Sequence, residues 1–271
     1  MTELLAHPMV QGGVAPFVVA LIVTLLLLPA RLSGLAIIAG FAVTVYLVSG
    51  FSFEPLTSTR KIILLGVASG LIGVLFNLLG GFLWRPFIAV LAAACAVWVC
   101  MRVLQQQPIA VALQWGFGCA LYVGWLVYLM DGLSEMPVRA ASAGVALGLG
   151  TGMAALMGAS ALLGQYGMSL GAAAMAYALV MLVINRDLPC GRSFTLPLGL
   201  TTGLIGCFAV LTAQLPWYAL FPLAAIPMAT KLPVPKKSIV LVRLVLTSLG
   251  PLALAAGAIY LSWRLNGAPP L

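Results

Sequence analysis

Ionisable side chains suited to catalysis are scarce in this sequence. It has five aspartates and glutamates in total and one histidine among 271 residues. The histidine, His7, lies in the N-terminal tail, outside every long apolar block. This excludes paired-histidine haem ligation within such a block, and histidine-based zinc, copper or di-iron centres. No carboxylate lies at the middle of an apolar block, so carboxylate-driven proton coupling is not expected.

The cysteines form no pattern typical of a metal site or a disulfide framework. The sequence has five, no Cys-x-x-Cys pair occurs, and all but Cys190 lie inside apolar blocks. Thiols in such surroundings usually act as small apolar side chains. We therefore expect no metal and no cofactor. The other four are Cys95, Cys100, Cys119 and Cys207.

Long apolar blocks are what the sequence has in abundance. Hydrophobic residues make up 63% of the chain and charged residues only 7%. A block of about 20 apolar residues can cross the hydrocarbon core of a bilayer as a helix. The sequence therefore predicts an all-α, multi-pass membrane protein, with residues 1–271 forming a single integral membrane domain. The expected location is the plasma membrane, as in the inner membrane of a bacterium.

Ten membrane spans can be drawn, separated by short polar gaps, and no room remains for a soluble domain. The N-terminal tail has no Lys or Arg, so the first block is interpreted as a retained span and not as a secretory signal. The predicted spans are 14–30, 32–50, 62–84, 87–101, 109–130, 140–164, 167–184, 193–213, 217–230 and 238–263. The fourth and ninth are short, and Gln165-Tyr166 is predicted as the turn between the sixth and seventh.

The net charge of +8 predicts an orientation, not a nucleic-acid partner, because the basic residues are scattered singly through loops. Most of them fall in loops after odd-numbered spans, which the positive-inside rule places in the cytoplasm. Both termini are then predicted to lie outside. The pair Arg60-Lys61 is an exception, because it lies on the outer side in this arrangement.

Two segments half the chain apart are similar. Residues 66–73 read GVASGLIG, and residues 199–206 read GLTTGLIG. Five spans would separate the copies, so halves 1–133 and 134–271 would have opposite topology, as in inverted-repeat transporters. The arrangement resembles that of five-plus-five transporters such as the drug/metabolite transporter families, although no motif assigns the chain to one of them. Chance similarity in a chain rich in Gly and Leu is the alternative.

Several polar or helix-breaking residues are candidates for substrate binding. Arg243 is the only charge inside a predicted span, where it either contacts an anionic group or extends to the interface. Amides and hydroxyls within spans need partners, which are more often structural than functional. Prolines in the short ninth span would free carbonyl groups near a site. The candidates are Asn77, Gln114, Thr201, Thr202, Pro222, Pro227 and Arg243.

Loop charges suggest gates. Glu54 with Arg60, and Asp187 with Arg192, are close enough in sequence to pair at opposite faces. Solvated loop charges or helix caps are the alternative interpretation.

The leading hypothesis for function is transport of a small, largely apolar or weakly charged molecule by alternating access. The alternative is a non-catalytic membrane subunit or assembly factor, for which the glycine-rich sixth span would form an exposed stripe that needs a partner. A lipid-modifying enzyme would have to use Asp131, Glu135 and Arg139. The expected partners are membrane lipid, a small-molecule substrate, and either a second copy or another membrane subunit.

Overall fold

The described part of the chain is helical throughout. The computed structural model describes all residues except 1–6, 52, 80–83, 159, 234–238 and 267–271, and no β-strand occurs among those described. In chain order the elements are η1 (Val10–Val14), α2 (Ala15–Leu26), η2 (Ser33–Leu35), α3 (Ala36–Val48), α4 (Ser58–Leu79), α5 (Trp84–Leu104), α6 (Ile109–Asp131), α7 (Pro137–Met157), α8 (Ala161–Ile184), α9 (Gly191–Thr212), η3 (Trp217–Ala219), α10 (Leu220–Ala229) and α11 (Val240–Asn266).

The all-helical structure is compatible with the predicted multi-pass membrane bundle. Among the described residues, seven helices are long and apolar enough to cross a membrane: α4 to α9 and α11. Three shorter apolar helical segments, 10–26, 33–48 and 217–229, fall below the usual spanning length of about 20 residues. The predicted total of ten spans therefore stays a prediction.

Two predicted boundaries were wrong. The fourth span is not short, because α5 extends over 21 residues, Trp84–Leu104. The predicted turn at Gln165-Tyr166 lies inside α8, because α7 ends at Met157 and α8 begins at Ala161. The Ser160 side chain caps α8 by accepting a hydrogen bond from the Leu163 amide. Gly164 and Gly167, which flank Gln165-Tyr166, are helical and pack closely against Gly152 of α7.

The contact between α7 and α8 is a packing of backbone against backbone. A Cβ atom added to Gly148 would overlap the backbone of Gly171, and one added to Gly167 would lie 2.5 Å from the Cα of Gly152. Small residues one helical turn apart allow such an approach between membrane helices. The glycine-rich face of α7 is therefore covered within the chain.

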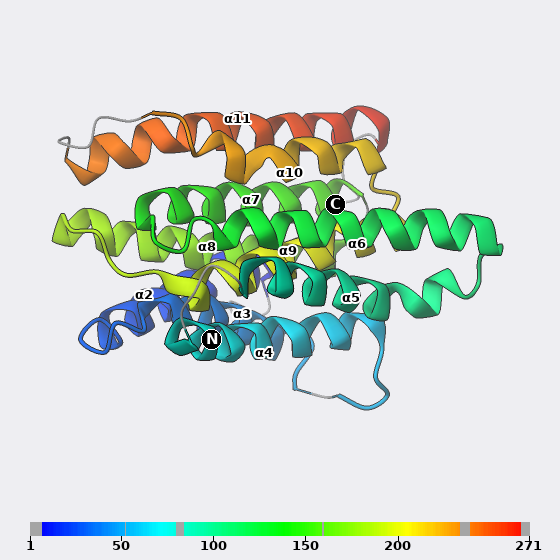
Figure 1. Cartoon of the computed structure of the whole chain (residues 1–271), viewed down its shortest axis with the longest axis horizontal. Helices are drawn as coiled ribbons and strands as arrows, with labels where there is room; N and C mark the ends of the chain where they lie inside the picture. Colours follow the sequence, from blue (N-terminus) through cyan, green and yellow to red (C-terminus); the bar gives the residue numbers. More distant parts are fainter. Residues whose placement is uncertain (1–6, 52, 80–83, 159, 234–238, 267–271) are drawn as a thin grey trace.

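Helices α7, α8 and α9 form the centre of the bundle. In Figure 1, α10 and α11 lie on one side of α7, while α2 to α5 lie on the other side of α8 and α9. In the 18-residue apolar stretch of α9 that could span a membrane, 83% of the residues are buried. The corresponding share is 22% for α6 and for α11. The outer helices therefore present apolar side chains to the surroundings, as expected for helices in contact with lipid.

The internal repeat stays a prediction. The two similar segments lie on α4 and α9, which pack against each other, and Gly66 faces the hydroxyl of Thr201. The two halves are nevertheless packed differently. Helix α7 contacts α8, α9 and α11, whereas its counterpart α2 packs on α3 and α8.

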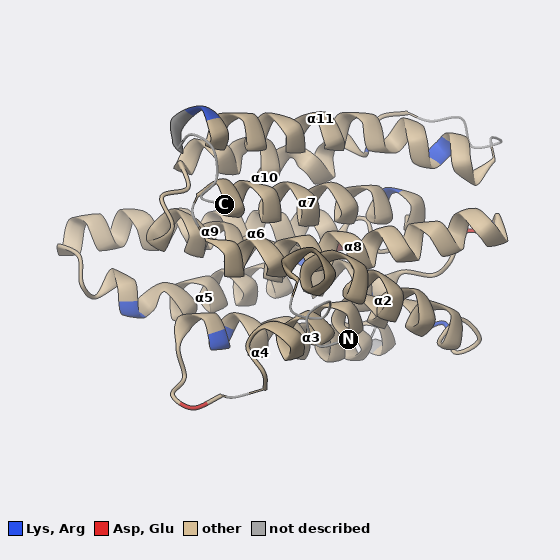
Figure 2. Ribbon diagram, turned by 180° about the vertical axis from the view of Figure 1, so that it is seen from behind, with Lys and Arg blue, Asp and Glu red and all other residues tan. Residues whose placement is uncertain are grey.

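Basic residues lie at both ends of the bundle (Figure 2). More of them lie at the end where the loops after the odd-numbered predicted spans meet, which we call the basic end. It holds Arg31, Arg85, Arg139, Arg186, Arg192 and Lys231, with Arg243 near the start of α11. The opposite end has fewer basic residues, namely Arg60, Lys61, Arg102 and Arg264. Lys236 and Lys237 lie outside the described residues.

Candidate functional site

The segment 185–192, which joins α8 to α9, is held at the basic end by contacts from several elements. Asn185 ends α8 in a left-handed conformation (φ 51°), and its side-chain oxygen accepts a hydrogen bond from the amide of Val240 at the start of α11. The Tyr177 hydroxyl donates to the Leu188 carbonyl at 2.6 Å. The hydroxyl of Ser33 donates to the next carbonyl, that of Pro189. The segment is thus a junction of η2, α8, α9 and α11.

Cys190 and Gly191 connect the segment to the loop after α6. The Cys190 thiol donates to the Ser134 carbonyl at 2.8 Å, and the Gly191 amide donates to the same oxygen at 3.2 Å. Burial raises the pKa of the Cys190 thiol to about 12, so it stays protonated at neutral pH and serves as a donor. Gly191 has φ 60°, a conformation that glycine adopts at little cost.

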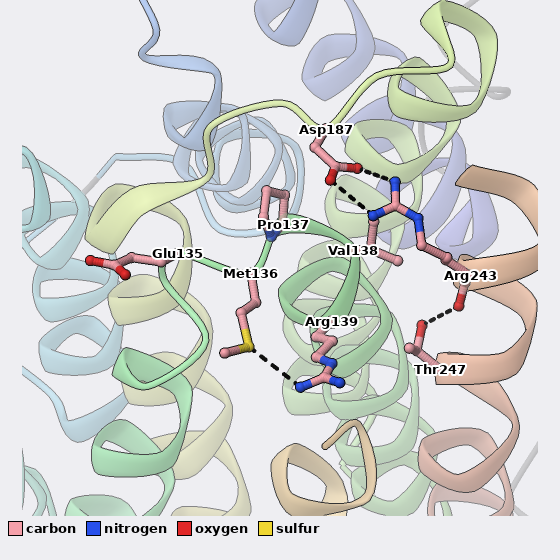
Figure 3. Close-up of a pocket in the computed structure, with 8 residues that line it drawn as sticks. All are labelled: Glu135, Met136, Pro137, Val138, Arg139, Asp187, Arg243 and Thr247. Carbon is pink, nitrogen blue, oxygen red and sulfur yellow. Dashed lines mark hydrogen bonds and ion pairs between the residues drawn. The ribbon is translucent and has the colours of Figure 1, made fainter. Parts of the chain in front are cut away.

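Asp187 forms an ion pair with Arg243, near the start of α11. The two carboxylate oxygens accept hydrogen bonds from Nη1 and Nη2 of the arginine at 3.0 and 2.7 Å (Figure 3). Both side chains are partly exposed, 24% for Arg243 and 42% for Asp187. Arg243, predicted as a charge within a span, therefore pairs with a loop carboxylate.

A pocket of about 360 Å³ opens beside this pair. Residues Glu135 to Arg139, Asp187, Arg243 and Thr247 line it (Figure 3). The Arg243 Nε is buried and has no hydrogen-bond partner among the described residues. Farther along α11, the hydroxyls of Thr247 and Ser248 contact that of Ser142 on α7 at 2.8 and 3.0 Å. The pocket lining thus combines charged groups with one hydroxyl group, that of Thr247, which contacts Ser142 behind it.

A second ion pair lies deeper at the same end. Nε of Arg192 donates to Asp131 at the end of α6 at 2.8 Å, and the two side chains are only 11% and 6% exposed. Nη1 of Arg192 donates to the Phe76 carbonyl, and the Arg192 amide donates to the Asn77 side-chain oxygen at 2.8 Å. Asn77, a predicted binding residue, thus joins the end of α4 to the start of α9.

The predicted pairing of Asp187 with Arg192 was wrong. Asp187 pairs with Arg243 and Arg192 with Asp131, because the turn at Gly191 directs Arg192 toward the ends of α4 and α6. At the opposite end, Arg60 donates to the Pro55 carbonyl at 2.7 Å, next to Glu54 in sequence. A gate formed by Glu54 and Arg60 stays a prediction.

The other predicted binding residues are dispersed. Gln114 is exposed on the flank of α6. Thr202 donates to the Leu198 carbonyl of its own helix at 2.5 Å, whereas the Thr201 hydroxyl is buried without a partner in the described structure. Pro222 lies in the first turn of α10 and Pro227 is buried inside it. The structure does not bring these residues into one cavity with Arg243.

The three residues that a lipid-modifying enzyme would have to use do not come together in one site either. Asp131 is held by Arg192, and Glu135 is exposed. Arg139 donates to the Leu232 carbonyl at 3.2 Å and contacts the Met136 sulfur. Within the described residues, no group of three or more His, Cys, Asp or Glu side chains could hold a metal ion.

The sequence did not reveal the partnership of Asp131 with Arg192, although both residues fall at span ends on the same predicted side. Opposite charges at adjacent span ends can form an ion pair, so these positions could have suggested the partnership.

No known family model matches the sequence, and a search of curated proteins finds no match.

Proposed function

We propose that this protein transports a small, largely apolar or weakly charged molecule across the plasma membrane by alternating access, with the Asp187–Arg243 pair as the gate at the basic end. On this proposal the basic end faces the cytoplasm and both termini lie outside. The ten-span, inverted-repeat arrangement belongs to the same proposal, with α4 and α9 as the helices that carry the similar segments.

The contrast between the two ion pairs carries the proposal. A partly exposed pair contributes only about 0.2–1 kcal/mol, so it can open and close at little cost. Breaking a buried pair costs roughly 3–5 kcal/mol, so Asp131–Arg192 is suited to holding α6 and α9 together. The partly exposed Asp187–Arg243 pair borders the pocket and joins α11 to the segment leading into the central helix α9. That is the arrangement that a gate requires.

The bundle interior is consistent with an uncharged or weakly charged cargo. Buried hydroxyls such as those of Thr24, Ser69 and Ser262 donate to carbonyls of their own helices. The glycine-rich face of α7 packs on α8 and is not exposed to a partner subunit. Both features favour transport over the alternative of a non-catalytic subunit.

Spin-label distances test the proposal without knowledge of the substrate. One label pair, Arg186→Cys with Lys231→Cys, reports on the basic end, and another, Gln106→Cys with Thr212→Cys, reports on the opposite end. All four positions are exposed. Asp187→Asn removes the ion pair with little change in shape. We expect it to lengthen the first distance and shorten the second in electron-resonance measurements on protein in lipid nanodiscs.

Glu135→Gln is the matched control, because it removes a carboxylate that lines the same pocket and has no ion-pair partner among the described residues. It should leave both distances unchanged. If Asp187→Asn moves only one end, or neither, alternating access controlled by this pair is wrong and the subunit alternative becomes the better explanation.

A further inference from the structure

A second cavity lies on the outside of the bundle, between α5 and α6. These two helices follow each other in the chain and pack side by side (Figure 1). The cavity has a volume of about 530 Å³, within the range of about 300–1,000 Å³ that is usual for small-molecule sites. We call it the α5–α6 groove. Its lining is mostly apolar and includes Val97, Met101, Leu113 and Phe117.

The α5–α6 groove changes in character along its length. The residues of α6 that line it, from Ile109 to Ala120, are all apolar, and this stretch rises about 17 Å along the helix. Gln105 and Gln107, in the connection between α5 and α6, line the groove at one end and are the polar residues of its described lining. The groove therefore suits a molecule with a long apolar chain and a polar group at one end.

A cation lies beside the polar end of the groove. Arg102 is in the last turn of α5, one residue after Met101 and three before Gln105, both of which line the groove. The Arg102 side chain is exposed, and it forms no hydrogen bond or ion pair with another described residue. Its guanidinium is therefore available to a partner that approaches along the groove.

A second cation lies about one helical turn away. The Lys61 ammonium donates to the Trp98 carbonyl at 3.0 Å and lies 4.5 Å from the centre of the Trp98 ring. No carboxylate is among the described residues that line the groove, and Glu54 lies in the loop before α4. The polar end of the groove is therefore complementary in charge to an anionic group.

We propose that the α5–α6 groove binds a phospholipid with a net negative headgroup, its acyl chain lying along α6 and its phosphate beside Arg102. An arginine can donate two parallel hydrogen bonds to a phosphate, and the glutamine amides can donate to other oxygens of the headgroup. In a bilayer that α5 and α6 span, their connection lies near the headgroups, where such a lipid is present. This binding does not depend on transport.

Native mass spectrometry counts bound lipids directly. The full-length protein is purified in detergent and titrated with phosphatidylglycerol or with phosphatidylcholine that has the same acyl chains. Both lipids contain a phosphate, but only phosphatidylglycerol has a net negative charge, so the comparison isolates that charge. We expect one phosphatidylglycerol to bind with an affinity about fivefold higher than that of phosphatidylcholine.

Two substitutions identify the site, each with a matched control. Arg102→Gln removes the cation, and Arg264→Gln is its control, because Arg264 is also exposed in the last turn of a helix at the same end. Ala112→Phe places a bulky side chain in the groove, and Ala110→Phe is its control, because Ala110 is exposed on the same helix and does not line the groove. Circular dichroism and gel filtration establish that the variants remain folded.

Arg102→Gln should bring the two lipids to equal affinity, Ala112→Phe should remove the first binding step for both, and the two controls should change neither. A preference for phosphatidylglycerol that survives in Arg102→Gln would overturn the assignment of the headgroup. Lipid binding that is unchanged in Ala112→Phe would overturn the site. A mass of two chains that Ala112→Phe converts to one would assign the groove to a second copy instead. None of these results depends on the spin-label experiment, so failure of this site and failure of the transport proposal are distinguishable.

Discussion

Arg192 and Arg243 show how burial separates two residues of the same type at one end of a bundle. Arg192 is enclosed between Asp131, the Phe76 carbonyl and the start of its own helix. Arg243 reaches a partly exposed carboxylate beside a pocket. An arginine in low-dielectric surroundings needs its partner, whereas one in contact with water can exchange it. The first residue is therefore suited to stability and the second to movement.

This difference predicts unequal stability losses. Asp131→Asn leaves Arg192 buried without a countercharge and should lower the free energy of unfolding by about 3–5 kcal/mol. Asp187→Asn should lower it by less than about 1 kcal/mol, because solvent screens the Arg243 pair. Unfolding of the purified protein by increasing denaturant in mixed micelles measures both values. Equal losses in the two variants would contradict the assignment of Arg192 to stability.

The candidate site was only partly predictable at this scale. Asp187, Arg192 and Arg243 stand out in the sequence because so few charges accompany such long apolar blocks. Their partners do not follow from sequence distance. Asp187 is five residues from Arg192, yet it pairs with an arginine more than fifty residues away, because Gly191 turns the chain between them. Which charged residues form ion pairs therefore depends on how the helices pack together.

At the scale of elements, apolar length predicted helices well wherever charged or turn residues end a block. The predicted span 109–130 corresponds to α6, Ile109–Asp131, and 193–213 corresponds to α9, Gly191–Thr212. The boundary between α7 and α8 was predicted wrongly, because Gln165 and Tyr166 interrupt the apolar pattern and yet are buried inside α8. The Tyr166 hydroxyl has its hydrogen-bond partner, Ser49, in a distant part of the chain, which the local sequence pattern does not show.

The close packing of α7 on α8 predicts a large effect of a small substitution. Gly148→Ala adds one methyl group where the backbone of Gly171 already lies. The helices must separate, and we expect a loss of roughly 1–3 kcal/mol of stability. Gly257→Ala is the control, since nothing lies within 4 Å of that Cβ position and alanine is the better helix former. Thermal unfolding of both variants in the same detergent compares them, and similar midpoints would show that the contact is looser than described.

For the molecule as a whole, orientation links the charge distribution to the proposed gate. The helices bring the loops after odd-numbered spans to the basic end, so the sequence-based grouping of Lys and Arg is also a spatial one. If the positive-inside rule holds, that end faces the cytoplasm, and the Asp187–Arg243 pair closes the cytoplasmic side. The opposite end, with Arg60, Lys61 and Arg102, then faces outward.

A labelling experiment on intact cells tests this orientation. Arg102→Cys and Lys231→Cys place exposed thiols at opposite ends of the bundle, while the native cysteines are buried or half-buried. A maleimide that cannot cross the membrane should label Arg102→Cys in intact cells and Lys231→Cys only after the cells are opened. The reverse pattern would place the basic end outside. The pocket beside Arg243 would then open to the exterior, and the gate proposed here would control entry from outside instead of exchange with the cytoplasm.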